Sequence, residues 1–215
     1  INSKFNLNSC RFDLIIKDKT KKKSIIKNIN LNLIGKHNIL NATAAITICL
    51  NLGIKIKTIK LALKNFTGVE RRMTKILTKN KNEFYDDYAH HPTEILSVLE
   101  GIKKVSKNKK ITSVFQPHRY SRVNNLKIEF SKSFINSHSV ILCPVYAAGE
   151  KIDKRFNLIS FAKLISKNSK VRVIIIKEEK DLGNYLKKNI IKNEIIIGMG
   201  AGSISNWMRN LSKTL

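Results

Sequence analysis

The sequence has few acidic residues, few cysteines and no long apolar run. Asp and Glu number 15 against 41 Lys and Arg, so the formal net charge of the 215 residues is +26. The three cysteines, Cys10, Cys49 and Cys143, lack C-x-x-C spacing, which indicates neither a disulfide framework nor a zinc site and favours a reducing cytoplasm. No apolar run approaches the roughly 20 residues that span a bilayer. We therefore expect a cytoplasmic protein that does not enter a membrane.

The length of the chain and its first residues bear on domain number. Domains typically contain about 100–150 residues, so the chain can hold one or two of them. The first residue is Ile1 rather than Met, and the residues after it do not have the pattern of a secretory leader. We expect a chain cut from a longer protein.

The excess of positive charge raises nucleic acid as a partner, because clustered Lys and Arg neutralise phosphates. Here the basic runs 21–23 and 107–110 fall in expected turns, and the sequence has no aromatic-interleaved basic helix. The abundance of Lys, Asn and Ile is typical of an AT-rich genome. We interpret the lysines as solvated surface charge and expect no nucleic-acid partner. A basic nucleic-acid-binding domain remains the alternative from a different functional class.

Apolar periodicity divides the chain into two parts, of which the first is residues 1–69. We expect two strands, then a helix that ends at Gly53 because glycine adopts the left-handed C′ conformation, then a second helix. The expected ranges are strands 5–17 and 24–34 around a turn at 18–21, and helices 37–52 and 58–66. The apolar stripe of the second helix would comprise Ile59, Leu61, Leu63 and Phe66.

The second part, residues 70–215, alternates between strand and helix patterns after a break at 67–70. Such alternation predicts an α/β fold with a mostly parallel sheet covered on both faces. The expected strands are 73–78, 83–88, 111–116, 139–145, 171–177 and 194–198, and the expected helices are 93–105, 124–136, 158–166, 178–189 and 203–213.

Two polar clusters follow strands of this expected sheet, where ligands of α/β proteins bind. The first is Asp86-Asp87-Tyr88-Ala89-His90-His91-Pro92-Thr93-Glu94, in which Pro92 is well placed to open a helix. The second is Phe115-Gln116-Pro117-His118-Arg119-Tyr120-Ser121-Arg122. If the two strands are neighbours, two acids, three histidines and two arginines share one cleft.

Each of these groups also has a structural interpretation. Asp87 could be a strand-end cap, and Arg119 and Arg122 could be surface charges. At a spacing of i, i+3 on a helical turn the two arginines would share a face and could bind a carboxylate or phosphate. The tandem pair His90-His91 points its rings in different directions and has no third ligand at suitable spacing, so we predict no metal site.

The two motifs together resemble those of the UDP-N-acetylmuramate:L-alanine ligases, which belong to the Mur ligases of peptidoglycan synthesis. The resemblance implies that residues 1–69 are the C-terminal part of a P-loop-type central ATP-binding domain. It implies that residues 70–215 are the Rossmann-like C-terminal domain that presents the amino acid. The implied partners are ATP, Mg²⁺, L-alanine and UDP-N-acetylmuramate, which react through an acyl phosphate that the alanine amine attacks.

The resemblance also implies roles for individual residues. The segment Lys36-His37-Asn38-Ile39-Leu40-Asn41 matches an adenine-binding H-N-x-x-N motif, with His37, Asn38 and Asn41 as its functional residues, because an Asn amide can both donate and accept. Arg72, within Gly68–Met73, would approach the nucleotide, and Asp87 would bind the ribose across an interdomain cleft. Met73 stands where Phe is more usual. Tyr88 would lie by the alanine methyl group and His90 near the phosphates. The alanine carboxylate would be surrounded by His118, Arg119 and Arg122; His90, Arg119 and Arg122 would serve catalysis.

Some parts of such an enzyme are not present in the sequence. It has no G-x-x-x-x-G-K-[ST] loop, so the triphosphate and Mg²⁺ ligands would lie in a missing N-terminal part, and the fragment alone would be inactive. The Gly198–Ser203 stretch is a weak dinucleotide fingerprint, and its glycines would permit close packing. Residues 146–150 would be structural or line the cleft. The ligase that reattaches a recycled tripeptide to UDP-N-acetylmuramate is a close alternative, although its second motif differs.

Overall fold

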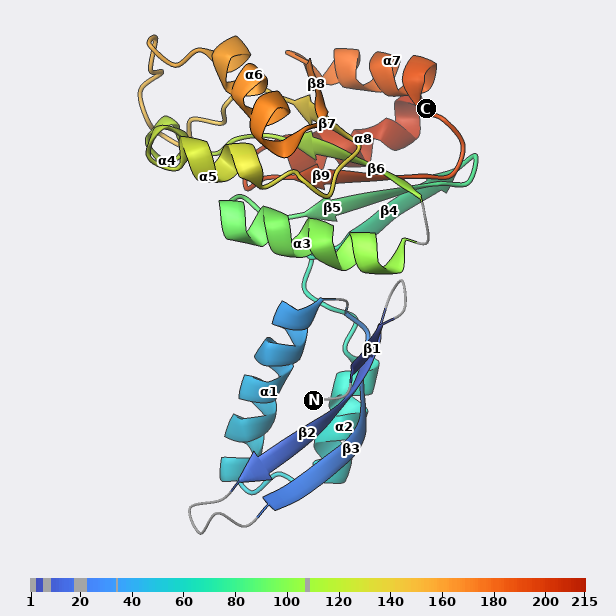
Figure 1. Cartoon of the computed structure of the whole chain (residues 1–215). Helices are drawn as coiled ribbons and strands as arrows, with labels where there is room; N and C mark the ends of the chain where they lie inside the picture. Colours follow the sequence, from blue (N-terminus) through green and yellow to red (C-terminus); the bar gives the residue numbers. More distant parts are fainter. Residues whose placement is uncertain (1–2, 6–8, 18–22, 34, 107–108) are drawn as a thin grey trace. The chain divides into compact units, whose positions relative to one another are not determined.

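The structure, a computed structural model, describes residues 3–5, 9–17, 23–33, 35–106 and 109–215 (Figure 1). The chain divides into two compact units, Ile1–Val69 and Glu70–Leu215. The expected turn at 18–21 and parts of the basic runs 21–23 and 107–110 lie outside the described residues. Within the described part, no helix has the length and apolarity that a membrane crossing requires.

The first unit contains an antiparallel sheet in the order β1-β2-β3, with two helices packed on it. The elements are β1 (Ser3–Phe5), β2 (Cys10–Lys17), β3 (Lys23–Leu31), α1 (Lys36–Asn51) and α2 (Ile56–Asn65). The expectation of a single strand over 5–17 was wrong. Phe5 pairs with Cys10 in antiparallel register, so the chain reverses and this stretch contributes to two strands.

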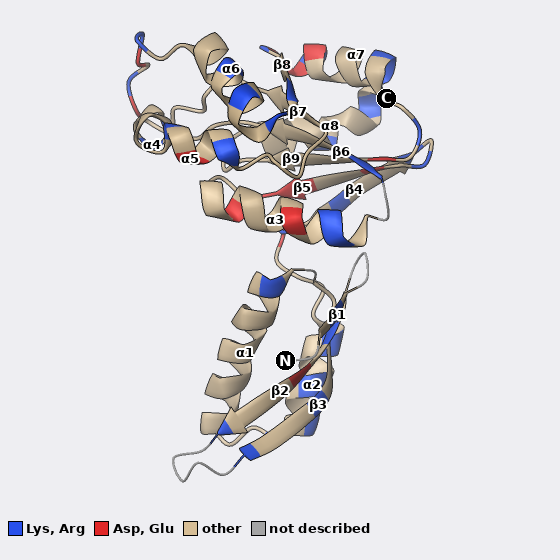
Figure 2. Cartoon of the chain, viewed as in Figure 1, with Lys and Arg blue, Asp and Glu red and all other residues tan. Residues whose placement is uncertain are grey.

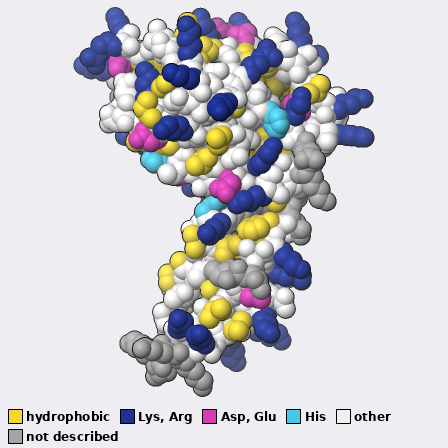
Figure 3. All heavy atoms as spheres, in the orientation of Figure 1, with side chains coloured by type: hydrophobic (Ala, Val, Ile, Leu, Met, Phe, Trp, Pro, Cys, Tyr) yellow, Lys and Arg dark blue, Asp and Glu magenta, His cyan; other side chains and the backbone are white. Residues whose placement is uncertain are grey.

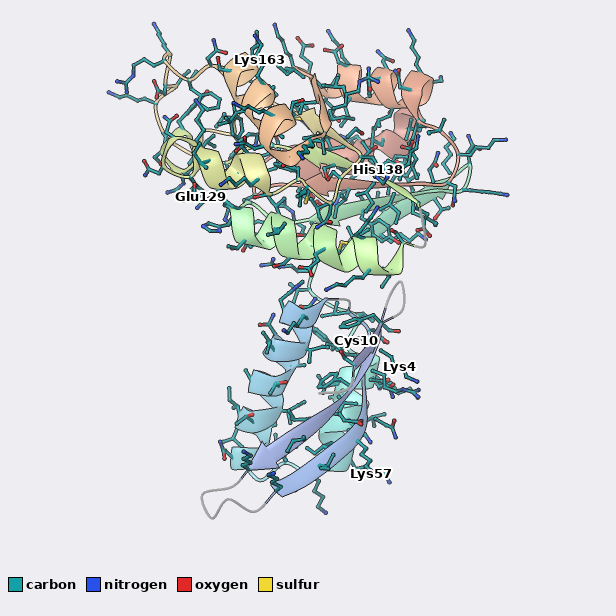
Figure 4. All side chains as sticks on the ribbon, in the orientation of Figure 1. Lys4, Cys10, Lys57, Glu129, His138 and Lys163 are labelled. Atoms are coloured by element: carbon teal, nitrogen blue, oxygen red, sulfur yellow. The ribbon has the colours of Figure 1, made fainter. Side chains whose placement is uncertain are left out.

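The core of this unit lies between the sheet and the helices. Phe12 and Ile29 from the sheet and Ile39 and Ile46 from α1 are at most 3% exposed. Cys10, labelled in Figure 4, is buried in the same core, and this burial raises the pKa of its thiol to about 11. The cysteine is therefore an inert core residue at neutral pH.

The end of α1 confirms the role predicted for Gly53. The Gly53 backbone has φ +76, its N–H donates to Leu50 O at 3.0 Å, and the Ile54 N–H donates to Cys49 O at 3.0 Å. These two bonds form a Schellman motif, which satisfies carbonyls that the helix leaves unpaired. By contrast, the stripe predicted for α2 was partly wrong, because Leu61 and Phe66 are exposed. Leu61 lies only two positions from the buried Ile59, on another face of the helix.

The second unit is a six-stranded sheet in the order β4-β5-β9-β6-β7-β8. All neighbouring pairs are parallel except β4 and β5, so the prediction of a mostly parallel α/β sheet is confirmed. Its strands are β4 (Thr74–Lys79), β5 (Asn82–Asp87), β6 (Lys110–Phe115), β7 (Ser139–Leu142), β8 (Arg172–Ile175) and β9 (Glu194–Met199). Its helices are α3 (Pro92–Val105), α4 (Tyr120–Asn125), α5 (Lys127–Lys132), α6 (Leu158–Ser169), α7 (Glu179–Asn189) and α8 (Ile204–Thr214).

Alternate residues of the strands fill two cores, one on each face of this sheet. Phe84, Val114 and Ile196 pack with α7 and α8 on one face. On the other face Phe115 of β6 packs against Phe130 of α5, with ring centroids 5.6 Å apart. This period-two pattern is the one that a sheet covered on both faces requires.

Two sequence expectations for this unit were wrong in detail. Instead of one helix over 124–136 the structure has α4 and α5, because Leu126, at φ −116° and ψ 27°, leaves the helical conformation between them. The strand expected to reach residue 145 ends at Leu142. Pro144 follows two residues later, and it cannot donate to a ladder.

Lys and Arg side chains are scattered over both units rather than gathered in one patch (Figures 2 and 3). In Figure 2 the blue segments occur on strands and helices throughout the chain, among them the end of α3 and parts of α6 and α7. On the face that Figure 3 shows, the dark blue side chains are interspersed with hydrophobic and other atoms.

Candidate active site

Three parallel strands of the second unit end in one row. Met199 of β9 pairs with Asp87 of β5 on one side and with Phe115 of β6 on the other. The two strands that precede the clusters, β5 and β6, are not neighbours, because β9 lies between them. The two polar clusters nevertheless meet across the end of β9, where the rings of His90 and His118 lie with centroids 5.7 Å apart.

The glycines after β9 allow Gln116 and Tyr146 to approach the backbone closely. A Cβ at Gly200, which has φ +149, would lie 2.7 Å from the backbone oxygen of Gln116. A Cβ at Gly202 would lie 2.4 Å from Cγ of Tyr146. The Gln116 amide in turn accepts from the Ile204 N–H at 3.0 Å and donates to the Ser203 hydroxyl at 3.1 Å. The close packing predicted for these glycines is confirmed, whereas the part played by Ser203 was not predicted.

Asp87 is a buried carboxylate at the end of β5. Its side chain is enclosed, with the residue 1% exposed, and its oxygens accept from the Ala89 N–H at 2.8 Å and the Met73 N–H at 2.9 Å. Burial raises the pKa of Asp87 from 3.8 to about 6, although these two N–H groups and Arg72 oppose the rise. The strand-end cap that we considered as the structural interpretation is thus present. A ligand hydroxyl could donate only to the lone pairs that remain.

This raised pKa predicts a pH dependence of stability. A carboxyl group with a higher pKa in the folded state binds protons more tightly there, so Asp87 should make the fold more stable as pH falls from about 6 to 4. The difference, roughly two pKa units, corresponds to about 3 kcal/mol. In Asp87→Asn the free energy of unfolding should lose this dependence. Urea titrations at pH 7 and pH 4, followed by the fluorescence of the single tryptophan, Trp207 of α8, measure it.

Asp153→Asn is the control of opposite sign. The backbone N–H and side chain of Arg155 lower the pKa of Asp153, so its contribution to stability is present above the unfolded pKa and is lost as pH falls. An unchanged pH dependence in Asp87→Asn would mean that Asp87 titrates as an ordinary carboxyl group.

Arg71 joins the turn before β4 to the ends of β5 and β9. One of its Nη atoms donates to Gly200 O at 2.6 Å, its Nε lies 3.7 Å from Asp86 Oδ2, and its guanidinium lies 4.8 Å from the centre of the Tyr88 ring. Asp86 is fully buried, accepts from the Ser205 hydroxyl and lies 3.8 Å from Arg209. No role was predicted for Arg71, which is distinguished in the sequence only as a member of the Arg71-Arg72 doublet.

Tyr88 and His90 extend from the loop between β5 and α3. Their rings meet edge to face with centroids 5.1 Å apart. His90 Nδ1 lies 2.9 Å from Tyr88 O and 3.4 Å from Glu94 Oε2. Tyr88 remains 37% exposed, so a ligand could reach its ring.

The tandem histidines have separate environments, as the sequence suggested. His91 is the N-cap of α3 and forms a capping box with Glu94, and Pro92 occupies the first turn as predicted. The capping box satisfies backbone N–H groups at the helix start. His91 is therefore structural, whereas His90 lies beside the ring of His118. Among the described residues no group of three or more His, Cys, Asp or Glu is arranged to hold a metal ion.

His118 contacts Arg122 and Tyr146. Its Nδ1 lies 3.3 Å from an Nη of Arg122, and its ring stacks on Tyr146 with centroids 5.7 Å apart. Burial, followed by the charge of Arg122, lowers the pKa of His118. Because an arginine can only donate, we assign the proton of the neutral imidazole to Nε2. A fifth histidine, His138, accepts from the Ile111 N–H at 3.0 Å at the start of β6 and is structural (Figure 4).

The two arginines do not share a helical turn, so that expectation was wrong. Arg119 precedes α4 with φ 67° and ψ 129°, and only Arg122 lies within the helix. Positive φ is uncommon for a residue with a side chain and costs about 1–3 kcal/mol unless the surroundings impose it. Arg119 is exposed and Arg122 is partly buried. Arg122 contacts His118 Nδ1 at 3.3 Å, and the charges of Arg122 and Arg119 both lower the pKa of His118.

The nucleotide residues predicted in the first unit lie at the start of α1. His37, Asn38 and Asn41 fall in its first two turns, after Gly35 with φ +98. A Cβ at Gly35 would lie 2.6 Å from the His37 ring, so the glycine lets this ring fold over the helix start. In the second unit Arg72 is exposed, with its guanidinium 5.8 Å from the centre of the Tyr88 ring. The structure therefore presents polar groups at both sets of predicted positions.

The second unit is an α/β domain with a mostly parallel sheet, and its polar side chains gather at the carboxyl ends of β5, β9 and β6, where ligands of such domains bind. The family model described as "Mur ligase, glutamate ligase domain" matches residues 71–202, more than half of the chain. The chain belongs to the Mur ligase family.

The chain is also similar to individual ligases in sequence and in fold. The UDP-N-acetylmuramate–L-alanine ligase of Pelagibacter ubique is 49% identical over 95% of this chain, which corresponds to 44% of that protein. The crystal structure of the UDP-N-acetylmuramate–alanine ligase from Thermotoga maritima has a TM-score of 0.74 at 24% identity and covers 99% of this chain and 44% of its own. A murein peptide ligase from Psychrobacter arcticus has a TM-score of 0.66 at 20% identity, over 97% of this chain and 42% of its own. The chain thus spans less than half the length of these relatives.

Proposed function

We propose that the chain is part of an enzyme that uses ATP to join L-alanine to UDP-N-acetylmuramate through an acyl phosphate. The observation that carries the proposal is the 49% identity with an L-alanine ligase over 95% of the chain. We propose the cytoplasm as its compartment on the cysteine usage alone.

The cationic side of the site supports an amino-acid carboxylate as ligand. Arg122, Arg119 and the neutral His118 offer donors at the end of β6, and Tyr88 presents an exposed ring beside them. A guanidinium group binds a carboxylate with two parallel hydrogen bonds, which fixes the orientation of a small molecule. We propose that His118, Arg119 and Arg122 bind the alanine carboxylate, with Tyr88 by its methyl group.

We propose that the nucleotide is bound by His37, Asn38, Asn41, Arg72 and Asp87. The Asn amides fit an adenine edge, since each can donate and accept. ATP would supply the phosphoryl group that activates the muramate carboxyl group, and His90, Arg119 and Arg122 would stabilise the oxyanion charge that develops. The ligands of Mg²⁺ and of the triphosphate would lie in the part of the enzyme outside this chain.

Asp87 offers a test of the nucleotide site. In the full-length enzyme Asp87→Asn should raise the KM for ATP, because charge-assisted bonds to ribose hydroxyl groups are worth roughly 1.5–3 kcal/mol each at most. The KM for alanine should stay near that of the wild type. A raised alanine KM with an unchanged ATP KM would place Asp87 on the other substrate.

The function itself is tested by expressing the full-length protein and measuring phosphate release with ATP, UDP-N-acetylmuramate and L-alanine. Omission of either co-substrate should abolish the signal. The tripeptide-recycling ligase is the main alternative, and selective use of a tripeptide over alanine would establish it. Salt-dependent retention on DNA, without ligation, would instead support a nucleic-acid-binding domain.

A further inference from the structure

The loop after β7 forms backbone hydrogen bonds with the segment that carries His118 and Arg119. We call residues 146–150 the clasp loop. Its first residue, Tyr146, donates its N–H to Pro117 O at 2.8 Å and accepts from the Arg119 N–H at 2.8 Å. These bonds form an isolated parallel bridge between His118 and Tyr146. The clasp loop therefore extends the pairing of β6 and β7 beyond the ends of both strands.

The last residue of the clasp loop, Glu150, binds the start of α4. Its carboxylate accepts from the Ser121 N–H at 3.1 Å and from the Ser121 hydroxyl. The backbone of Tyr120 also contributes to lowering the pKa of Glu150, after the Ser121 hydroxyl and N–H. A carboxylate that accepts several hydrogen bonds at a helix start is well placed, because the unpaired N–H groups there carry partial positive charge.

The clasp loop is itself held in a defined conformation. Ala148 and Gly149 both have positive φ, at 51° and 86°, and the Glu150 N–H donates to Ala147 O at 3.1 Å. The Tyr146 ring packs where Gly202 has no side chain, as described above. The loop thus has fixed contacts at both ends, so Glu150 can restrain the segment that it binds.

Arg119 is the residue that needs such restraint. Its backbone conformation is strained and persists only if the surrounding contacts impose it. The bonds to Tyr146 hold the N-terminal side of this residue, and those from Glu150 hold the turn that follows it. A negative charge close to a site for a carboxylate is unfavourable unless donors engage it, which Ser121 does here.

We propose that Glu150 is a positioning residue that fixes the backbone of Arg119 and the start of α4, and so aims Arg119 and Arg122 at the amino-acid carboxylate. The proposal rests on the function proposed above. It assigns Glu150 no contact with the substrate, because its carboxylate is occupied by the helix start. Its effect should therefore appear in the use of the amino acid and not in the use of ATP.

The first test measures the restraint directly in the chain of residues 1–215. In Glu150→Gln the backbone N–H groups of Arg119 and Ser121 should exchange with deuterium about tenfold faster than in the wild type, because local opening becomes easier. The N–H of Val114 in β6 should exchange at an unchanged rate. Equal protection at Arg119 and Ser121 in the two proteins would overturn the proposal, whatever reaction the enzyme catalyses.

The second test uses the kinetics of the full-length enzyme. Glu150→Ala should raise the KM for alanine about fivefold, and Ser121→Ala about twofold because the N–H bond to Glu150 remains. The KM for ATP should stay constant in both. Ser121→Thr keeps the hydroxyl group and should restore the alanine KM.

Asp153→Asn is the matched control for these kinetics. Asp153 follows the clasp loop and accepts from the Asn124 side chain at 3.1 Å, at the far end of α4. The Asp153→Asn substitution should leave the KM for alanine unchanged. A matching rise in Asp153→Asn and Glu150→Ala, or an equal rise for ATP and alanine, would show a general structural role and overturn the proposal. If the wild-type enzyme does not ligate alanine, the proposed function fails, while the exchange test still decides the role of Glu150.

Discussion

Residues 1–215 by themselves are expected to release no phosphate from ATP in the presence of UDP-N-acetylmuramate and L-alanine. The chain contains no G-x-x-x-x-G-K-[ST] loop and spans 44% of the length of its Pelagibacter relative. Without such a loop the triphosphate has neither a nest of backbone N–H groups nor the lysine that aligns the γ-phosphoryl group. The proposed amino-acid site alone cannot supply this alignment, so we expect total loss of turnover.

The full-length protein at the same concentration is the positive control for this experiment. Trp207, which packs against the core of the second unit, reports whether the shorter chain is folded in the assay. Sustained turnover by residues 1–215, dependent on both co-substrates, would contradict the assignment of residues 1–69 to the end of an ATP-binding domain. Activity that follows only the addition of the N-terminal part that we propose for the enzyme would support it.

Local sequence signals predicted most elements of the fold because each depends on a few neighbouring residues. Gly53 ends α1 through its left-handed backbone, and Pro92 opens α3 where its missing N–H does no harm. The alternation of strands and helices after Arg72 predicted the parallel sheet. In each case the determinant lies within one or two turns of the residue that it governs.

Strand order could not be predicted in the same way. The last strand, β9, inserts between β5 and β6, and it pairs with residues about 80 to 110 positions earlier in the chain. The sequence left open whether β5 and β6 are neighbours, and in the structure the two clusters meet across the end of β9. The meeting of the two polar clusters was predictable because parallel strands end at one edge of a sheet. The position of β9 between their strands was not predictable.

The backbone of Arg119 is the clearest example of a site feature that the sequence conceals. The spacing of Arg119 and Arg122 indicated a helical turn, yet Arg119 has positive φ and lies outside α4. The contacts that impose this conformation come from Tyr146 and Glu150, more than 25 positions away along the chain. Local propensity gives no sign of such a long-range constraint. For the same reason the sequence predicted only that residues 146–150 are structural or line the cleft, and not the positioning role that we propose for Glu150.

In the full-length enzyme Arg122→Lys is expected to lower kcat/KM for L-alanine about tenfold or more, equivalent to roughly 1.4 kcal/mol. Lysine keeps the charge but loses the planar fork, and it also loses the geometry of the contact between Arg122 and His118 Nδ1. Alanine has few other handles, because burial of its methyl group is worth only about 0.8 kcal/mol. A misplaced carboxylate would misaim the amine at the acyl phosphate.

The kcat/KM for ATP in Arg122→Lys should stay near that of the wild type, since no nucleotide group is assigned to α4. Arg155→Lys is the matched control, because Arg155 lies in the same unit with its side chain 93% exposed and bound to Asp153. Arg155→Lys should change kcat/KM for neither ATP nor alanine. Steady-state kinetics with each substrate varied in turn decide the matter: equal losses for ATP and alanine would identify Arg122 as a structural arginine that holds the loop through His118, rather than one that binds the amino acid.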